Sequence, residues 1–260
     1  MVTALNAAAS GMEAQQTQIE QISNNLSNVQ TTGYKKTRAE FQDLLYETLQ
    51  EPGANTSTLT QSPIGLQRGM GVKVAGTQRN FEMGAPQKTG RDLDIMIKGD
   101  GFFVVAMPNG ELAYKKDGAF FRSAVGRIET VDGYPIQPDI VVPPDAKKIE
   151  ISEDGMVQAV MSETERTQIG QIQLASFVNN GGLKAVGKNL FLATEGSGPA
   201  NLSQPGEGTV GGVMQYFLEG SNVNVVQEMV GLISAQRAYE MNSKVIQSVD
   251  QLLQHTVNIR

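Results

Sequence analysis

The feature that most constrains this chain is a seven-residue repeat of apolar residues at each of its ends. At the N-terminus, a companion row lies three positions after the first row, and all its members are apolar except Gln15. Two apolar rows sustained over four heptads are typical of a coiled-coil seam. With Thr3 as N-cap and Gly33 as the terminating residue, we expect a helix of about 26 residues, about 39 Å long. Its expected assembly residues are Leu5, Met12, Ile19 and Leu26.

The C-terminal segment has the same repeat, and no proline interrupts it after Gly231. Asn224 is the expected N-cap, and Glu228 in the first turn suits the helix dipole. The companion row is half polar, which favours an assembly with many polar contacts over a dry core. Arg237 is a candidate interface anchor because Arg and Tyr are enriched where surfaces lose water, although it could be an ordinary exposed side chain. The expected seam residues are Val225, Leu232, Tyr239, Ile246 and Leu253.

Between Asp92 and Leu192 the apolar period changes from seven to two, as in the run from Leu93 to Lys98. Asn-Gly and Asp-Gly dipeptides punctuate this region and supply the positive φ of tight turns. We therefore predict a β domain of roughly 100 residues. The sequence indicates an α+β fold, in which long N- and C-terminal coiled-coil helices form one discontinuous helical domain and the middle region is mainly β.

Two stretches rich in Gly, Pro, Ser and Thr, residues 50–71 and 196–212, are expected to be connectors. The first is too long for an ordinary loop, so it calls for a role. We expect three domains. They are a terminal helical assembly domain (1–36 and 218–260), a connecting domain (37–91 and 207–217) with an extended loop at 46–63, and an outer β domain (92–206).

The terminal helices cannot be stable on one seam alone. Ordering each residue costs about 1 to 2 kcal/mol, and each large apolar side chain returns only about 1.5 to 3 kcal/mol on burial. Folding of the ends is then expected to be coupled to polymerisation. An intramolecular two-helix hairpin and a simple coiled-coil dimer fit the same pattern.

Composition excludes several classes of function. The net charge of -6 and the pI near 5.0 give little support to nucleic-acid binding. The absence of cysteine rules out disulfides and thiolate chemistry. The N-terminus has no basic residue before Lys35 and does not resemble a secretory signal peptide, and no apolar run is long enough to insert into a membrane.

No residue pattern predicts catalysis, and we expect no catalytic, cofactor-binding or metal site. The single histidine, His255, lies near the end of the C-terminal helix and is expected to be a surface or packing residue. Asp92, Asp94 and Asp100 cluster in sequence, but the first two flank Leu93 on an alternating strand and are expected to face solvent. The glycines at 65, 69 and 71 lack the lysine and helix of a phosphate loop.

Four segments together resemble the flagellar rod and hook family. NNLSNVQTTGYK, residues 24–35, is similar to its N-terminal motif, and residues 221–253 are similar to its C-terminal motif. The segments IKGDGFFVV (97–105) and AYKKDGAFFRSAVGRI (113–128) also resemble it. Within the family, the segment from Tyr46 to Pro63 resembles the insertion that distinguishes the straight distal rod from the curved hook.

This resemblance implies a helical homopolymer that serves as drive shaft and export channel, with the terminal helices lining the channel and the β domain outside. It implies a rod-stiffening role for the segment marked by Tyr46, Pro52, Gly53 and Pro63. The implied partners are proximal rod proteins, the hook protein, the surrounding P and L ring proteins and the flagellar export apparatus. The implied location is the basal body, where the rod crosses the periplasm after type III export without a cleaved signal peptide.

Three alternatives stay open at this point. The chain could be another axial rod or hook protein. It could be a periplasmic enzyme with a β domain, such as a glycan hydrolase, which needs paired carboxylates in a cleft. It could also be a generic coiled-coil scaffold of fixed oligomeric state.

Overall fold

The computed structural model describes residues 2–52, 55–57, 60–61, 64–162 and 165–258. The chain divides into two compact units. Unit 1 comprises Met1–Ser27, Thr37–Gln78 and Asn224–Arg260, and unit 2 comprises Asn28–Lys36 and Arg79–Val223. Both chain termini therefore belong to one unit, which is the unit that contains the two long helices.

The N-terminal helix, α1, spans Val2–Ser27 and has the expected length of 26 residues. It begins before Thr3, which lies inside the helix and is not its N-cap, so that expectation is wrong. Gly33 lies six residues beyond the end of the helix, in a turn, and has the positive φ (67°) expected of it. The end of the helix at Ser27 fits the Asn28 that follows it, because Asn side chains compete with helical backbone hydrogen bonds.

The C-terminal helix, α2, spans Val225–Asn258, 34 residues. Asn224 is its N-cap, as predicted. The Asn224 Oδ1 accepts hydrogen bonds from the backbone N–H groups of Val226 (3.1 Å) and Gln227 (3.3 Å). These two bonds satisfy donors that the first turn of a helix leaves free.

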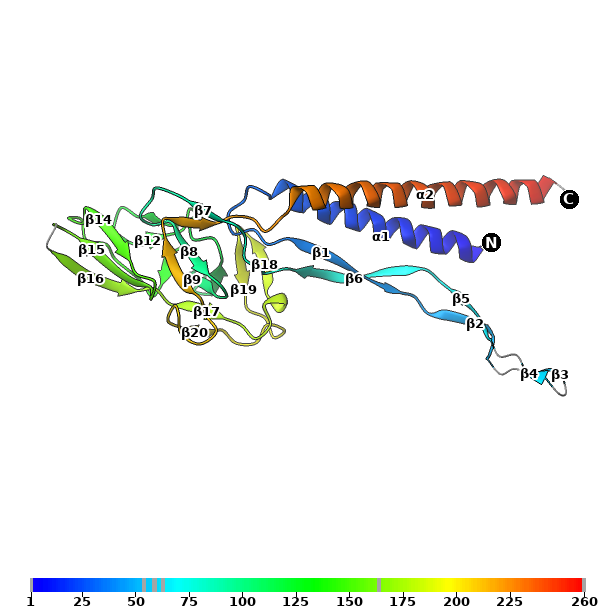
Figure 1. Ribbon diagram of the computed structural model, residues 1–260, viewed down its shortest axis with the longest axis horizontal. Coiled ribbons are helices and arrows are strands. Elements are labelled where there is room, and N and C mark those ends of the chain that lie inside the picture. Colours follow the sequence, from blue (N-terminus) through cyan, green and yellow to red (C-terminus); the bar gives the residue numbers. More distant parts are fainter. Residues whose placement is uncertain (1, 53–54, 58–59, 62–63, 163–164, 259–260) are drawn as a thin grey trace. The chain divides into compact units, whose positions relative to one another are not determined.

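The third part of unit 1 is a β-ribbon, a run of paired strands that lies beside α1 in Figure 1. Sequence patterns favoured a connector here, with an extended loop at 46–63. Instead, the described residues pair in two-stranded antiparallel steps, because Thr, Tyr and Leu in this stretch suit extended backbone. The steps are β1 (Thr37–Asp43) with β6 (Val72–Arg79), β2 (Tyr46–Gln50) with β5 (Leu66–Gly69), and β3 (Asn55–Ser57) with β4 (Thr60–Gln61).

Unit 2 is built from strands, which confirms the mainly β middle region. Its largest sheet has the order β18-β19-β10-β9-β17-β20, with β13 also pairing β9. The strands of this sheet are β9 (Phe102–Ala106), β10 (Leu112–Lys115), β13 (Ile136–Gln137), β17 (Leu174–Ser176), β18 (Lys184–Gly187), β19 (Leu190–Leu192) and β20 (Asn201–Ser203).

Smaller sheets complete the unit, together with a short 3-10 helix, η1 (Asn180–Gly182). One has three strands, in the order β14-β15-β16, and three others are pairs. The three-stranded sheet contains β14 (Lys148–Ile151), β15 (Met156–Val160) and β16 (Arg166–Gln171). The pairs are β8 (Ile95–Lys98) with β21 (Gly212–Gln215), β7 (Pro86–Lys88) with β22 (Phe217–Glu219), and β11 (Phe121–Arg122) with β12 (Ile128–Glu129).

The core of unit 2 lies on both faces of β9. Successive side chains of a strand point to opposite faces, so Phe102 and Phe103 enter different hydrophobic clusters. Phe103 packs edge-to-face on Phe120, with ring centroids 5.1 Å apart, and Phe102 does the same with Phe81 at 5.5 Å. A strand covered on both faces reads as a continuous apolar run, which explains the sequence FFVV.

The Asn-Gly and Asp-Gly dipeptides do not all serve the turns predicted for them. Gly110 has a positive φ (83°) in the turn between β9 and β10, as expected. Gly118 does not, and a Cβ placed on it would overlap the carbonyl oxygen of Ile95. Glycine is required there because two segments of backbone come too close for any side chain.

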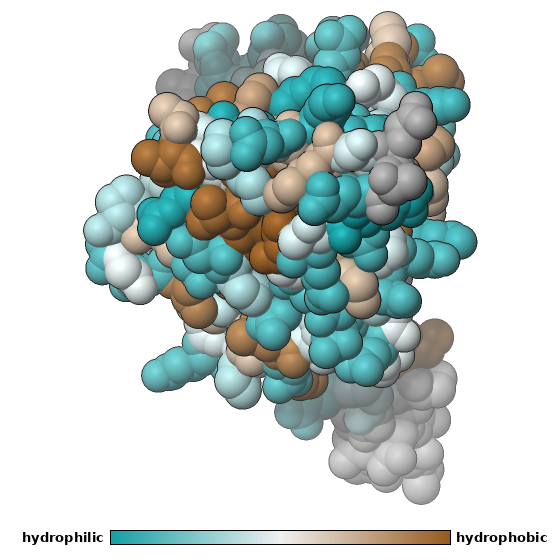
Figure 2. Space-filling model, turned by 90° about the vertical axis from the view of Figure 1, so that its left-hand side faces the viewer, coloured by the Kyte–Doolittle hydropathy of each residue, from teal (hydrophilic) through white to brown (hydrophobic). Residues whose placement is uncertain are grey.

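The surface of unit 2 that faces the viewer in Figure 2 is largely hydrophilic, with hydrophobic side chains in limited patches. Among the described residues, neither helix combines the length and the apolar character needed to cross a bilayer.

Candidate assembly surface

The two helices of unit 1 pack against each other in an antiparallel arrangement. A Cβ placed on Gly11 would lie 2.9 Å from Asn242 Nδ2, and one on Gly231 would lie 3.3 Å from Ile22 Cδ1. Nearer the end of α1, Asn25 Nδ2 donates to Glu228 Oε2 at 3.2 Å. From one of these contacts to the next, the residue number on α1 rises by as much as the residue number on α2 falls. The three contacts therefore belong to one antiparallel register. Glycines at this interface let the backbones approach closely.

The four predicted seam residues of α1 are all half-buried. The buried residues of this helix are Ala8, Ala14, Ile22 and Asn25. The heptad row is therefore not the most buried row of α1, a helix that contacts both α2 and strand β1 of the ribbon. On the ribbon side, Ser10 Oγ accepts from the N–H of Val72 (3.3 Å).

The predicted seam residues of α2 divide into two groups. Leu232, Ile246 and Leu253 are half-buried, whereas Val225 and Tyr239 are 38% and 40% exposed. The buried side of α2 is marked by Ala235, from the companion row that was expected to be half polar. The predicted anchor Arg237 is exposed.

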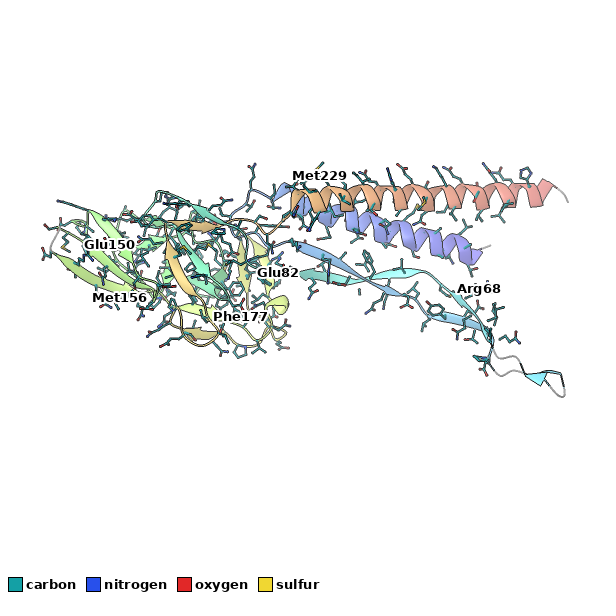
Figure 3. The ribbon with its side chains drawn as sticks, in the orientation of Figure 1. Arg68, Glu82, Glu150, Met156, Phe177 and Met229 are labelled. Atoms are coloured by element: carbon teal, nitrogen blue, oxygen red, sulfur yellow. The ribbon has the colours of Figure 1, made fainter. Side chains whose placement is uncertain are left out.

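A second apolar surface runs along α2 and is not covered by α1. Successive helix residues are about 100° apart, so Val226, Val230 and Ile233 lie on the side opposite Ala235. Figure 3 shows Met229 at the same end of the helix. We name this surface the outer apolar face; its members are Val226, Met229, Val230, Ile233 and Met241, each between 49% and 70% exposed.

The ribbon also exposes apolar side chains. Of the predicted rod-stiffening residues, Tyr46 is 55% exposed and Pro52 is exposed, while Gly53 and Pro63 lie outside the described residues. Leu45 and Leu66 are 88% and 56% exposed. A two-stranded ribbon on its own is marginally stable in water, so exposed leucines on it indicate a surface that another chain can cover.

A buried ion pair in unit 2 has no counterpart among the residues that the sequence predicted. Lys35 Nζ and Glu219 Oε1 lie 2.6 Å apart, and neither side chain has any exposed surface. Lys35 also donates to the carbonyl oxygen of Phe81 (3.2 Å), and the N–H of Gly84 donates to Glu219 Oε1 (2.9 Å). These bonds tie together three segments that are far apart in the sequence, residues 33–36, 80–88 and 216–223.

Asn222 reinforces the same junction. Its Oδ1 accepts from the N–H of Lys36 (2.7 Å), and its Nδ2 donates to the carbonyl oxygen of Asn80 (2.9 Å). We call Lys35, Glu219 and Asn222 the strand clamp. The clamp joins the segment that follows α1 to the segment that precedes α2. Partners separated by 184 positions leave no local pattern, so sequence reasoning could not find it.

A second buried lysine, Lys116, lies in the same unit. Its Nζ donates to the carbonyl oxygens of Gly99 (2.6 Å) and Gly101 (3.0 Å) and lies 5.6 Å from the ring centroid of Phe102. Loss of hydration lowers the pKa of the Lys116 ammonium to about 8, although the carboxylate of Glu219 acts in the opposite direction. Burial of the charged form therefore has a cost at neutral pH.

This cost predicts a dependence of stability on pH. An unfolded lysine keeps its proton up to its ordinary pKa of 10.5, whereas native Lys116 loses it near pH 8. Between these values the unfolded state binds more protons, so the unfolding free energy of unit 2 rises with pH, by up to about 3 kcal/mol. Urea unfolding followed by circular dichroism at several pH values measures this rise. The Lys116→Met variant is expected to lack it and Lys184→Met, at an exposed lysine, to keep it; equal rises in both variants would contradict the assignment.

Two of the three carboxylates considered for catalysis, Asp92 and Asp94, have structural partners. Asp94 was expected to face solvent, but it is only 2% exposed, because it forms a β-bridge directly before the buried strand β8. Its carboxylate lies 3.6 Å from the guanidinium of Arg91. Asp92 Oδ2 accepts from the N–H of Ile149 (3.3 Å), and Asp100 and His255 are exposed. Within the described part of the chain, no three His, Asp or Glu side chains gather as a metal site.

Three family models match separate parts of the chain. The flagella basal body rod protein model matches residues 5–35, which include most of α1 and Lys35 of the clamp. The flagellar hook protein FlgE/F/G D1 domain matches residues 96–159, within the β region of unit 2. The C-terminal model of the flagellar basal body rod FlgEFG proteins matches residues 214–259, which include α2.

Full-length relatives agree with these matches. The chain is 49% identical over 259 residues to the flagellar basal-body rod protein FlgG of Caulobacter vibrioides, covering 99% of each chain. It is 44% identical to the FlgG of Borreliella burgdorferi, covering 100% of this chain and 99% of the relative. It is also 36% identical to the FlgG of Bacillus subtilis over the whole of both chains.

Proposed function

Because the chain belongs to the family of flagellar basal-body rod proteins, and is thus a structural subunit of the rod rather than an enzyme, we propose that it polymerises into a stiff helical tube. This tube is the distal rod, which acts as drive shaft and export channel. The subunits reach it through the flagellar export apparatus and assemble where the rod crosses the periplasm. Proximal rod proteins, the hook protein and the P and L rings are its neighbours.

The observation that carries this proposal is the outer apolar face of α2. A helix packed against one partner needs one apolar stripe, yet α2 has a buried side at Ala235 and an exposed apolar side at Val226, Val230 and Ile233. A large exposed apolar surface on one helix marks a protein interface. Neighbouring subunits in the tube cover it and bury side chains that the single chain leaves in water.

The half-buried seam residues give α1 a matching surface. Leu5, Met12, Ile19 and Leu26 follow a strict heptad, so their remaining exposed area forms a continuous row. We propose that helices of neighbouring subunits extend the packing of α1 and α2 as a coiled coil. The terminal helices then form the inner assembly domain around the channel, residues 37–91 and 207–217, which include the ribbon, form the connecting domain, and residues 92–206 form the outer β domain.

Stiffness is assigned to the ribbon. Deletion of residues 46–69 removes both β2 and β5 and leaves β1 paired with β6, whose end is closed by the hydrogen bond from the N–H of Leu44 to the carbonyl of Gly71 (2.9 Å). This deletion is cleaner than one ending at residue 63, which would leave β5 without its partner. We expect polymers of the shortened chain to bend more, because contacts made by the exposed Tyr46, Leu49 and Leu66 are lost.

Electron microscopy of purified polymers measures this through their persistence length. The control is a chain of full length in which Val178, an exposed apolar residue of unit 2, is replaced by serine. It is expected to form straight polymers like those of the unaltered chain. Straight and equally stiff polymers from the shortened chain would remove the ribbon as the source of stiffness.

A further inference from the structure

Unit 2 has a surface groove lined mainly by basic side chains. This groove of about 450 Å³ is lined by four cationic side chains and only one acidic one. The cations are Arg91, Arg122, Lys147 and Lys148, and the acid is Asp92. In a chain whose net charge is -6, this concentration of positive charge is local. A cleft lined by charge of one sign attracts a partner of the opposite sign.

Arg91 and Lys148 lie close to carboxylates outside the groove, Asp94 (3.6 Å) and Glu150 (3.7 Å), whereas Arg122 and Lys147 form no ion pair with the described residues. Arg91 lies over the ring of Phe121, with its guanidinium carbon 4.1 Å from the centroid, and Arg122 donates to the carbonyl of Pro143 at 2.8 Å. Asp92 Oδ2 accepts a hydrogen bond from the N–H of Ile149, and its single negative charge offsets only one of the four positive charges. Phe121 is itself 40% exposed. The groove therefore combines fixed positive charge with an exposed aromatic ring, which suits an acidic segment that also carries apolar side chains.

The ribbon contains such a segment. Residues 43–51, DLLYETLQE, hold three carboxylates and no cation, and every residue except Leu44 is exposed. Leu45 and Leu49 are 88% and 50% exposed. Glu47 pairs with Arg68 at 3.5 Å, but both side chains are about half exposed, so this pair contributes little and the segment stays acidic.

We propose that the acidic ribbon segment of one subunit docks into the basic groove of a second copy of this chain. The inference rests on the proposed polymer and names the surface that the ribbon covers. Donor and acceptor are different surfaces of the same chain, so the contact is head-to-tail. Such contacts repeat without closing when successive subunits follow a helical path. Charge complementarity fixes the register of the contact, and the leucines and Phe121 provide its apolar part.

Reciprocal charge reversal tests the pairing. The groove variant is Arg122→Glu with Lys147→Glu, and the ribbon variant is Asp43→Lys with Glu51→Lys; all four positions are exposed. Each variant alone places like charges together, and we expect its critical concentration for polymerisation to rise at least about tenfold. An equimolar mixture restores complementary contacts in both directions, and polymerisation is expected to return. The matched control is Lys98→Glu with Lys184→Glu, exposed lysines outside the groove, which should polymerise normally.

The outcomes separate the possibilities. Polymerisation of both variants at the unaltered concentration would overturn the docking proposal and leave the proposed function intact. Loss in both variants without recovery in the mixture also overturns it. Recovery only when one chain carries all four substitutions would assign the segment to the groove of its own subunit. Failure of the unaltered full-length chain to polymerise under any condition would instead overturn the proposed function.

Discussion

Polymerisation is expected to fail when Val230 and Ile233 on the outer apolar face are both replaced by aspartate. The contact between subunits would lose two buried apolar side chains and gain two charges without partners. Together these changes cost at least about 4 kcal/mol, so the critical concentration rises about a thousandfold. Sedimentation of polymers over a range of subunit concentrations measures the change.

The single subunit should tolerate these substitutions. Val230 and Ile233 are 62% and 49% exposed, and exposed positions usually change unfolding free energy by less than about 0.5 kcal/mol. The control is Ser234→Asp, which adds one such charge at an exposed polar position of α2. It is expected to polymerise at nearly the unaltered concentration. A doubly substituted chain that polymerises as readily as this control would show that the outer apolar face is not an assembly surface.

The second large effect concerns the strand clamp. Glu219→Gln leaves the ammonium of Lys35 fully buried without a counter-charge, and removing one member of a buried pair costs about 3 to 5 kcal/mol. Lys35→Met is expected to cost about as much, because it leaves the carboxylate of Glu219 buried. The double variant should cost clearly less than the two single changes added together, since neither buried charge is then unpaired.

Hydrogen exchange locates this effect. The amides of Gly33 and Gly84 donate to the backbone carbonyl and the side chain of Glu219, so their protection should fall most in Glu219→Gln. The control is Asp139→Asn, which breaks an exposed pair with Arg127 (3.1 Å) and should cost less than about 1 kcal/mol. If Glu219→Gln proves no more costly than Asp139→Asn, the clamp does not stabilise unit 2.

Local patterns predicted the elements of this fold well where one period dominates. The heptads located both helices, Asn224 marked the start of α2, and alternation located the β region. The prediction was wrong for the described residues between 46 and 63, where Gly, Pro, Ser and Thr suggested a loop. Strands lie at 46–50, 55–57 and 60–61, and the first of them pairs with distant partners, as Tyr46 does with Gly69, 23 positions away. A hairpin whose long strands carry exposed side chains has no apolar alternation to reveal it.

The candidate site was predictable only in part. Heptads identified which helices take part in assembly, but the half-buried positions of Leu5 and Leu26 depend on α1 lying between α2 and the ribbon. In the sequence, the outer apolar face appears only as an excess of apolar residues in α2. It can be told apart from the buried side only when the side covered by α1 is known. Likewise, Asp94 appeared to alternate toward solvent but is buried beside Arg91.

What the sequence alone determined is the class of the molecule: an α+β chain with an assembly helix at each end, no cysteine chemistry, and a motif resemblance to the flagellar rod and hook family. These properties are carried by residues close together in the chain, where periodicity and motif spacing act. Tertiary structure alone decided the antiparallel register of the helices, the strand clamp and the side of α2 left uncovered. Each depends on contacts between residues more than 180 positions apart, which no local pattern specifies.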